Sequence, residues 1–166
     1  MKRIGLLSDT HGWLDPVVVK HLKECDEIWH AGDIGGIETA DRLSEIAPLR
    51  AVHGNIDDHD VRIVYPKHQR FLCEDVDVWI THIGGYPKNY DRNVKPEIFD
   101  NAPQLFVSGH SHILKVIFDK ELNLLHINPG ASGIHGFHKV QTMVKFTIES
   151  KEIKDLQVVE FGSKGK

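Results

Sequence analysis

Cysteine is scarce in this chain, with 2 among 166 residues, and the two are far apart in the sequence. Cys25 and Cys73 form no CxxC pair, which argues against a disulfide framework and against a thiolate metal cluster. Each lies in an apolar setting. We therefore expect buried free thiols in a reducing cytoplasm.

Long apolar runs and stretches of basic residues are missing as well. No apolar segment approaches the length of a membrane span, and too few apolar residues precede Asp9 for a signal peptide. The formal net charge is -4, and the basic end at residues 164–166 is short, so a nucleic-acid-wrapping surface is not expected. These absences predict a cytoplasmic protein without a membrane partner.

No repeats, low-complexity tracts or linkers divide the chain, whose length suits a single domain over residues 1–166. The first half alternates short apolar segments with helical patterns at residues 15–23 and 37–46. Asp15 followed by Pro16 is typical of a helix start. This alternation predicts βαβ units and a parallel sheet.

The second half changes character. It predicts antiparallel strands at residues 116–118, 122–127, 142–149 and 153–161, with tight turns near Lys120 and Ser150. Taken with the first half, the pattern predicts an α/β protein: a two-sheet β-sandwich with its sheets face to face and helices outside.

Histidine, by contrast, is abundant, with 12 residues, and it is the commonest metal ligand among side chains. Short polar clusters directly follow the apolar segments at residues 4–7, 27–30, 49–52, 76–80 and 105–107. The carboxyl ends of parallel strands meet at one rim of a sheet, where α/β proteins bind ligands. The clusters would bring these side chains to that rim: Asp9, His11, Asp33, Asn55, His82, His110 and His112.

These carboxylates, imidazoles and one amide are the makeup of a two-metal hydrolytic site. Nitrogen and oxygen ligands without a thiolate suit Mn, Fe, Zn, Ni or Co better than Mg or Ca. Singly, Gly32-Asp33 and Gly54-Asn55 are ordinary turn dipeptides, and Asp9 could cap a helix. The pair His110 and His112 after a strand has little structural use, so the clusters together favour metal binding.

The ordered series Asp9-x-His11, Gly32-Asp33, Gly54-Asn55, His82 and Gly109-His110-x-His112 resembles the calcineurin-like metallophosphoesterase family. Within it the chain is similar to the small, cap-less YfcE-type phosphodiesterases, over nearly its whole length. The resemblance implies a four-layer αββα fold. It implies one metal held by Asp9, His11, Asp33 and His112, and a second held by Asp33, Asn55, His82 and His110.

The function that the resemblance implies is a dinuclear-metal-dependent phosphodiesterase acting on small phosphodiesters, with manganese the favoured ion. The cations would lower the pKa of a bridging water, and the resulting hydroxide would attack phosphorus. The catalytic set would be Asp9, His11, Asp33, Asn55 and Asp57. The alternative is a catalytically weak scaffold of the Vps29 type, which a large exposed apolar patch would favour. A homo-oligomer stays open.

One departure from the family concerns the proton donor. Many members have a histidine after Gly-Asn as candidate general acid, and this chain has Ile56 there. Asp57 keeps the family's acidic position, where it would orient a neighbour or cap a turn. The remaining candidates for proton donation are His11, His53, His59 and His135.

The fourth motif is another departure, because the family commonly has His-Gly there and this chain has His82-Ile83. The loop that follows, at residues 85–92, mixes aromatic and cationic residues. Tyr86, Tyr90 and Arg92 would bind the leaving group, and the amide of Asn55 would contact a phosphate oxygen. A plain solvated loop is the alternative at residues 85–92.

Overall fold

The computed structural model describes residues 1–163, and the basic end at residues 164–166 lies outside this part. In chain order the elements are β1 (Lys2–Leu7), α1 (Pro16–Leu22), β2 (Glu27–His30), α2 (Ile37–Ile46), β3 (Leu49–Ala51), α3 (His59–Arg62), β4 (His68–Cys73), β5 (Val76–Thr81), β6 (Gly85–Tyr86), β7 (Asn89–Tyr90), α4 (Lys95–Asp100), β8 (Leu105–Val107), β9 (Leu114–Asp119), β10 (Leu124–Pro129), β11 (Val140–Glu149) and β12 (Glu152–Ser163).

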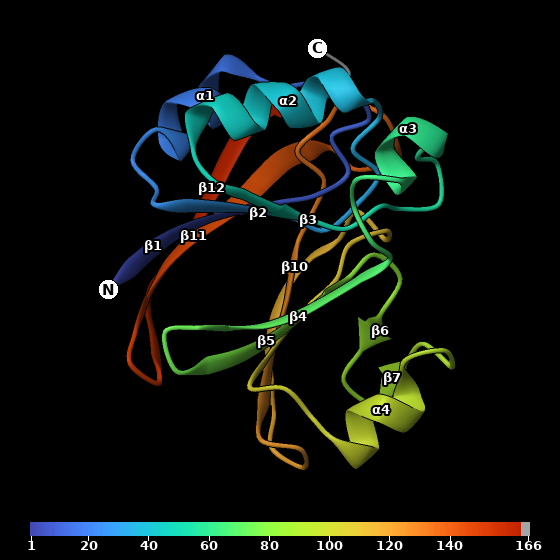
Figure 1. Cartoon of the computed structure of the whole chain (residues 1–166), viewed down its shortest axis with the longest axis vertical. Coiled ribbons are helices and arrows are strands. Elements are labelled where there is room, and N and C mark those ends of the chain that lie inside the picture. Colours follow the sequence, from blue (N-terminus) through green and yellow to red (C-terminus); the bar gives the residue numbers. More distant parts are fainter. Residues whose placement is uncertain (164–166) are drawn as a thin grey trace.

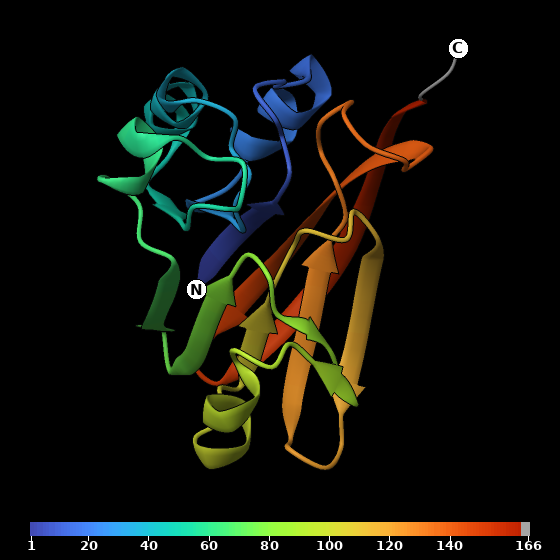
Figure 2. The ribbon, with the colours of Figure 1, turned by 90° about the vertical axis from the view of Figure 1, so that its right-hand side faces the viewer.

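The strands form two five-stranded mixed sheets and a small ribbon (Figure 1). The first sheet has the order β12-β11-β1-β2-β3, in which β1, β2 and β3 are parallel and β11 and β12 complete an antiparallel edge. The second has the order β4-β5-β8-β10-β9, with β5, β8 and β10 parallel. In Figure 2 the second sheet faces the viewer, and β11 and β12 pass behind it.

Apolar side chains that alternate along the strands fill the space between the sheets. Ile4 and Leu6 of β1 meet Val78 and Ile80 of β5 in this core. Successive side chains of a strand point to opposite faces, so Leu7 and its neighbours lie on the outer face of the first sheet. The first sheet therefore buries apolar side chains on both faces, and its outer face needs a covering layer.

Helices supply the covering layers. Leu22 of α1 and Leu43 of α2 pack on the first sheet, and Ile98 of α4 packs against Trp79 on the second. In Figure 1, α1 and α2 lie together at one end of the molecule and α4 lies at the other. The predicted two-sheet sandwich flanked by helices, in four layers, is confirmed. The layer outside the second sheet contains only the short helix α4 within residues 1–163.

Local sequence signals decided some elements and not others. The Asp15 side chain accepts a hydrogen bond from the Val17 N–H, and Pro16 opens α1 as predicted. The sequence analysis did not predict β4 or α3, whose mostly exposed or half-buried residues lack a buried apolar run. Within residues 1–163, the structure has no helix with the length and apolar content to span a membrane.

Burial of His126 on β10 makes the fold sensitive to acid. The imidazole packs against Phe106 and Tyr86, and burial lowers its pKa from 6.5 to about 4. The unfolded chain therefore takes up a proton at a higher pH than the folded protein. The free energy of unfolding should fall, by up to ~3 kcal/mol, as the pH drops from about 6.5 to about 4.

Denaturant unfolding near neutral pH and near pH 5 measures this effect. The His126→Phe variant should lose less stability between the two conditions than the wild type, because phenylalanine binds no proton. The exposed His59 provides a control, and His59→Gln should leave the loss unchanged. An equal loss in His126→Phe would show that other groups cause the acid sensitivity.

Candidate metal centre

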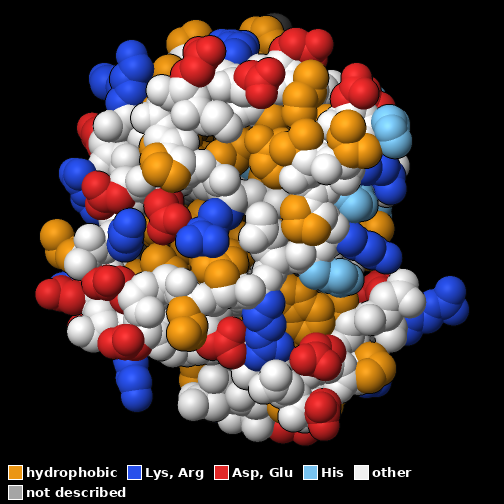
Figure 3. Space-filling view, in the orientation of Figure 1, with side chains coloured by type: hydrophobic (Ala, Val, Ile, Leu, Met, Phe, Trp, Pro, Cys, Tyr) orange, Lys and Arg blue, Asp and Glu red, His pale blue; other side chains and the backbone are white. Residues whose placement is uncertain are grey.

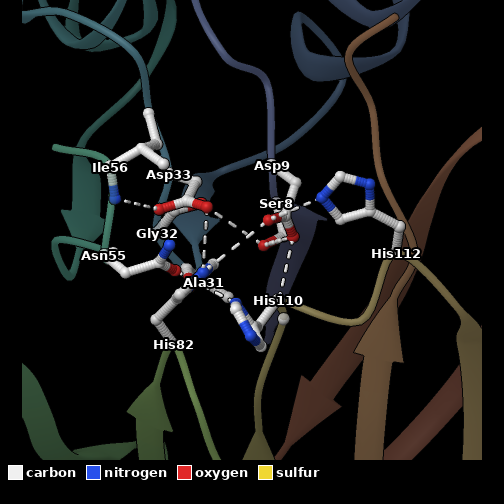
Figure 4. A network of polar contacts seen from close by, with 12 residues as sticks. Ser8, Asp9, Ala31, Gly32, Asp33, Asn55, Ile56, His82, His110 and His112 are labelled. Atoms are coloured by element: carbon white, nitrogen blue, oxygen red, sulfur yellow. Dashed lines mark hydrogen bonds and ion pairs between the residues drawn. The ribbon is translucent and has the colours of Figure 1, made fainter. Parts of the chain in front are cut away.

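The polar clusters found in the sequence lie together in the structure (Figure 4). The sequence analysis expected the strands before these clusters to share one parallel sheet, and this was wrong. β1, β2 and β3 belong to the first sheet, and β5 and β8 belong to the second. The site therefore lies where the carboxyl ends of both sheets meet. Hydrogen bonds cross this junction, such as the one from the His110 N–H to Asp9 Oδ2 at 3.1 Å and the one from His82 Nδ1 to the Ala31 carbonyl at 2.7 Å.

The side chains form two groups, and within each group the candidate ligand atoms lie within 4.8 Å of one another. The first group is Asp9, His11 and His112, and the second is Asp33, His82 and His110. His112 Nε2 is 3.3 Å from Asp9 Oδ1, and His82 Nε2 is 3.1 Å from Asp33 Oδ2. Asp33 Oδ2 is also 3.5 Å from His11 Nε2 in the first group. One carboxylate oxygen therefore faces both groups.

Buried polar atoms at this junction lack hydrogen-bond partners. Asp9 Oδ1, His11 Nε2 and His82 Nε2 are buried without a well-aligned hydrogen bond, although His82 Nε2 lies close to Asp33. Leaving such atoms unsatisfied costs about 1–3 kcal/mol each. Divalent cations, one held by each group, would satisfy all three atoms, so the residues present fit a metal site.

The atoms that face away from the junction are already occupied. Asp9 Oδ2 accepts hydrogen bonds from Ser8 Oγ at 2.6 Å and from the His110 N–H at 3.1 Å. His82 Nδ1 lies 2.7 Å from the Ala31 carbonyl, to which it donates, and this leaves Nε2 to face the carboxylates. Such outer partners fix the orientation of metal-binding side chains.

The backbone at these side chains is strained. Five of the candidate ligands have a positive φ: Asp9 (53°), His11 (47°), Asp33 (56°), His110 (71°) and His112 (64°). The left-handed region costs residues other than glycine of order 1 kcal/mol or more each, and such residues cluster at functional sites. No sequence signal indicated this, because each pattern also suits an ordinary turn.

Glycines beside the ligands leave room for ligands from neighbouring loops. A Cβ on Gly54 would lie 2.1 Å from Asp33 Oδ1, and one on Gly109 would lie 2.2 Å from Ser8 Oγ and 2.9 Å from Asp9 Oδ2. Any side chain at either position would displace a carboxylate or its partner. The dipeptides Gly54-Asn55 and Gly109-His110 are therefore explained by close approach as well as by turn geometry.

Electrostatics favour the metal-binding protonation state in three of these groups. His82 is the exception, because Asp33 and Asp9 outweigh its burial and raise its pKa. Burial opposes the charge on Asp9, but the neighbouring His112 and His82 outweigh it and lower its pKa. Burial likewise opposes the charge on Asp33, and His82 again outweighs it, so its pKa is lowered. Burial lowers the pKa of His11 and favours its neutral form. Ionised carboxylates and a neutral imidazole are the forms that bind cations.

Comparison with protein families gives a match over most of the chain. The family model described as the calcineurin-like phosphoesterase superfamily domain matches residues 1–151. The chain belongs to this superfamily. A Methanothermobacter thermautotrophicus protein named "Probable metallophosphoesterase" is 26% identical over 166 residues, spanning 96% of this chain and 93% of the relative.

Solved structures of other proteins share the architecture. One described as a novel archaeal phosphodiesterase has a TM-score of 0.73 and 19% identity, covering 96% of this chain and 99% of its own. Wild-type Vps29 from Entamoeba histolytica, solved as a complex with zinc, has a TM-score of 0.73 and 16% identity, covering 96% and 99%. At these identities the likeness shows the fold alone.

Asp57 lies outside the two groups and ties their loops together. Its carboxylate accepts hydrogen bonds from the backbone N–H groups of Gly54 (2.8 Å), Gly35 (2.9 Å) and Ile34 (3.1 Å). This corresponds to the orienting role considered from the sequence, and we treat Asp57 as a positioning residue and not as a catalytic one. Arg62 helps from α3, because its guanidinium donates to the carbonyls of Gly54, Asn55 and Asp57.

His30 also supports the site from behind. Its Nδ1 accepts a hydrogen bond from the Gly32 N–H at 3.0 Å, and its Nε2 lies 3.0 Å from Thr10 Oγ1. Burial lowers its pKa to about 4, so the ring stays neutral at physiological pH. His30 thereby links the loop after β1 to the loop after β2. From the sequence, only a surface role or a satisfied-core role was expected for His30.

Two depressions beside the ligands could receive a substrate. One of roughly 520 Å³ includes His11, Asn55, His110 and His135 in its lining, and the His135 ring stacks on His11 with a centroid separation of 4.8 Å. The other, of roughly 510 Å³, adjoins it at His110 and is lined by Tyr86 and Arg92. Asn55 Oδ1 lies 3.0 Å from His110 Nδ1. The predicted substrate contacts Asn55, Tyr86 and Arg92 thus all border the site. Tyr90 differs from them, because it is buried and its hydroxyl donates to Asp119 Oδ2.

A third depression, of roughly 340 Å³, carries positive charge that the sequence analysis missed. It is lined by Asn55, His82, Arg62, Lys67, His53 and His68, with Asp91 as its carboxylate. Neither Arg62 nor Lys67 forms an ion pair within residues 1–163. Histidine and basic side chains gather along the right-hand edge of Figure 3. Residues distant in sequence thus form a cationic surface on a chain of net negative charge.

Proposed function

We propose that this protein is a dinuclear-metal-dependent phosphodiesterase of small phosphodiesters, with manganese as the preferred ion. The observation that carries the proposal is the set of buried ligand atoms without hydrogen-bond partners, Asp9 Oδ1, His11 Nε2 and His82 Nε2, facing one another between the sheets. Membership of the calcineurin-like phosphoesterase superfamily supports the same reaction class. The shared fold with a protein described as an archaeal phosphodiesterase supports diesters as the substrates of this chain.

In this proposal the two residue groups hold the two metals. Asp9, His11 and His112 would bind one ion and His82 and His110 the other, with Asp33 shared and Asn55 completing the second set. Divalent cations in such a site supply Lewis acidity and lower the pKa of water. The strained loops keep the ligand atoms in place before any metal arrives, and this reduces the entropic cost of binding.

The proposal can be tested by measuring hydrolysis of bis-p-nitrophenyl phosphate by chelator-stripped protein, with and without added Mn²⁺. Hydrolysis should depend on Mn²⁺, and calorimetry should find two ions per chain. Calorimetry in the same buffer without substrate separates binding from turnover. Binding of two ions without turnover of any diester would reject the enzyme and leave a metal-binding scaffold. Turnover that survives metal removal would reject the metal mechanism.

The cationic depression should attract the anionic substrate. The Lys67→Glu variant should raise KM about 5- to 10-fold and leave kcat within about twofold, because reversing one nearby charge costs on the order of 1 kcal/mol. Steady-state kinetics at low and high salt check this, and added salt should shrink the difference. Lys20→Glu on α1 is the control for net charge. A fall in kcat alone would contradict a role in attraction.

A protein-interaction scaffold is the second candidate, and exposed apolar side chains favour it. Ile56, Ile113 and Phe137 line the depression beside His11, and Phe137 is fully exposed. Apolar side chains around a cleft suit a partner surface as well as an aromatic substrate. Active protein in the Mn²⁺ assay would favour the enzyme, because a scaffold requires no turnover.

A further inference from the structure

The hairpin β6–β7 brings Tyr86 into the depression beside His110. Gly85 makes the hairpin tight, since its φ is +73° and a Cβ there would lie 2.4 Å from the Asn89 carbonyl oxygen. Tyr86, His110 and Ser111 line the same depression. The phenol of Tyr86 is thereby held next to His110, a proposed metal ligand. Ile56 lines the other depression and not this one.

The hydrogen-bond partners of Ser111 determine where the phenolic proton points. Ser111 Oγ accepts from Asn128 Nδ2 and from the Ile113 N–H, each at 3.2 Å, and it contacts the Tyr86 hydroxyl. A hydroxyl has two lone pairs and one proton. Both lone pairs are taken by N–H donors, so Ser111 donates its proton to Tyr86. The proton of Tyr86 then stays available to a ligand in the depression.

Tyr90 shows the contrasting case in the same depression. Its hydroxyl donates to Asp119 Oδ2 at 2.6 Å, so that proton is committed to a carboxylate. No acceptor other than Ser111 contacts the Tyr86 hydroxyl in the part of the chain described. The two tyrosines thus differ in the one property that proton donation requires.

Asn128 fixes this arrangement relative to the proposed ligands. It is buried, its Nδ2 also donates to Gly109 O at 3.0 Å, and its Oδ1 accepts from the Gly130 N–H at 3.0 Å. The amide therefore has one orientation, and it holds the segment between Gly109 and Ser111. The same segment carries His110.

A positive charge lies beside the phenol ring. Lys115 Nζ is 4.5 Å from the centroid of the Tyr86 ring, and His126 contacts the ring edge-to-face with centroids 5.5 Å apart. Burial keeps His126 neutral, because its pKa is lowered to about 4. Lys115 is therefore the charge next to the ring, and an ammonium stabilises a phenolate that forms there.

We propose that Tyr86 is the catalytic acid that protonates the leaving-group oxygen, a role that rests on the proposed phosphodiesterase function. As the water oxygen bonds to phosphorus, the bond to the leaving oxygen breaks and that oxygen keeps the electron pair. The phenolic proton moves to this oxygen and yields an alcohol. The phenolate accepts the hydrogen bond of Ser111 beside Lys115, and solvent in the open depression returns its proton. The site thereby acts on esters of unactivated alcohols.

The test is a series of phosphodiesters whose leaving groups range from p-nitrophenol to a simple alcohol, assayed with Mn²⁺. The Tyr86→Phe variant should lose only a few-fold in kcat/KM on the p-nitrophenyl ester and on the order of 10²-fold on the alkyl ester. Its plot of log kcat/KM against leaving-group pKa should therefore steepen. Lys115→Met should steepen it less, and Tyr90→Phe, the matched control, should leave the slope unchanged.

Calorimetry of Mn²⁺ binding provides a readout apart from activity, and Tyr86→Phe should bind as many ions as the wild type. Weaker binding, or an unchanged slope in an active Tyr86→Phe, would overturn the role of Tyr86 alone. A steeper slope in His135→Ala with an unchanged one in Tyr86→Phe would do the same and assign the proton to His135. A wild type inactive on every ester would overturn the proposed function, and this inference with it.

Discussion

Replacement of Asp33 by asparagine should lower Mn²⁺-dependent diester hydrolysis by on the order of 10³-fold while the metal-free protein stays folded. Asp33 Oδ1 accepts a hydrogen bond from the Ile56 N–H at 3.0 Å, and Oδ2 faces His82 and His11. An asparagine would keep its oxygen toward the N–H donor. Its NH₂ group would then point at the proposed metals and could not bind them.

Thermal unfolding separates this effect from misfolding. Mn²⁺ should raise the melting temperature of the wild type, because a ligand that binds only the folded state stabilises it. Without metal, Asp33→Asn should melt below the wild type, because it removes the charged partner of His82, and it should gain little from Mn²⁺. Asp60→Asn on α3 is the exposed control and should behave as the wild type. A fully active Asp33→Asn would contradict a shared carboxylate.

Sequence patterns were sufficient for the fold wherever burial is regular. The apolar run before Asp9 and the run before His82 each end in a polar cluster, and alternation along β11 and β12 predicted their hairpin. The argument from strand ends did not predict that the parallel strands are divided between two sheets. Strand pairing depends on contacts between distant segments, and a buried strand has the same composition in either sheet.

The candidate ligands could be found because each follows a strand directly, and the structure brings them together. Most of the residues that position them could not. Only the resemblance suggested an orienting role for Asp57, and nothing pointed to Arg62. Both act through backbone groups of other loops, and backbone partners leave no trace in side-chain spacing. The sequence analysis gave Asn128 no role, although its amide donates to Ser111 Oγ beside Tyr86. Such roles follow from long-range contacts and from counting hydrogen-bond donors and acceptors.

Asp57→Asn should lower the free energy of unfolding by about 2 kcal/mol and weaken Mn²⁺ binding by roughly 10- to 100-fold, although Asp57 binds no metal in the proposal. Its two carboxylate oxygens accept from Gly54, Ile34 and Gly35. An asparagine has one oxygen, so its NH₂ group must face a backbone N–H that loses its acceptor. The loops that carry Asp33 and Asn55 would then separate.

The neighbouring Asp58 offers a matched control for this substitution. Asp58 caps α3 by accepting from the Val61 N–H at 3.2 Å, and asparagine caps a helix about as well as aspartate. Asp58→Asn should therefore leave both stability and metal affinity unchanged. Urea unfolding of the metal-free proteins and Mn²⁺ calorimetry at a temperature where both are folded provide the measurements. Wild-type affinity in a destabilised Asp57→Asn would show that Asp57 stabilises the fold without positioning the ligands, because loops that separate cannot keep their ligand atoms in place.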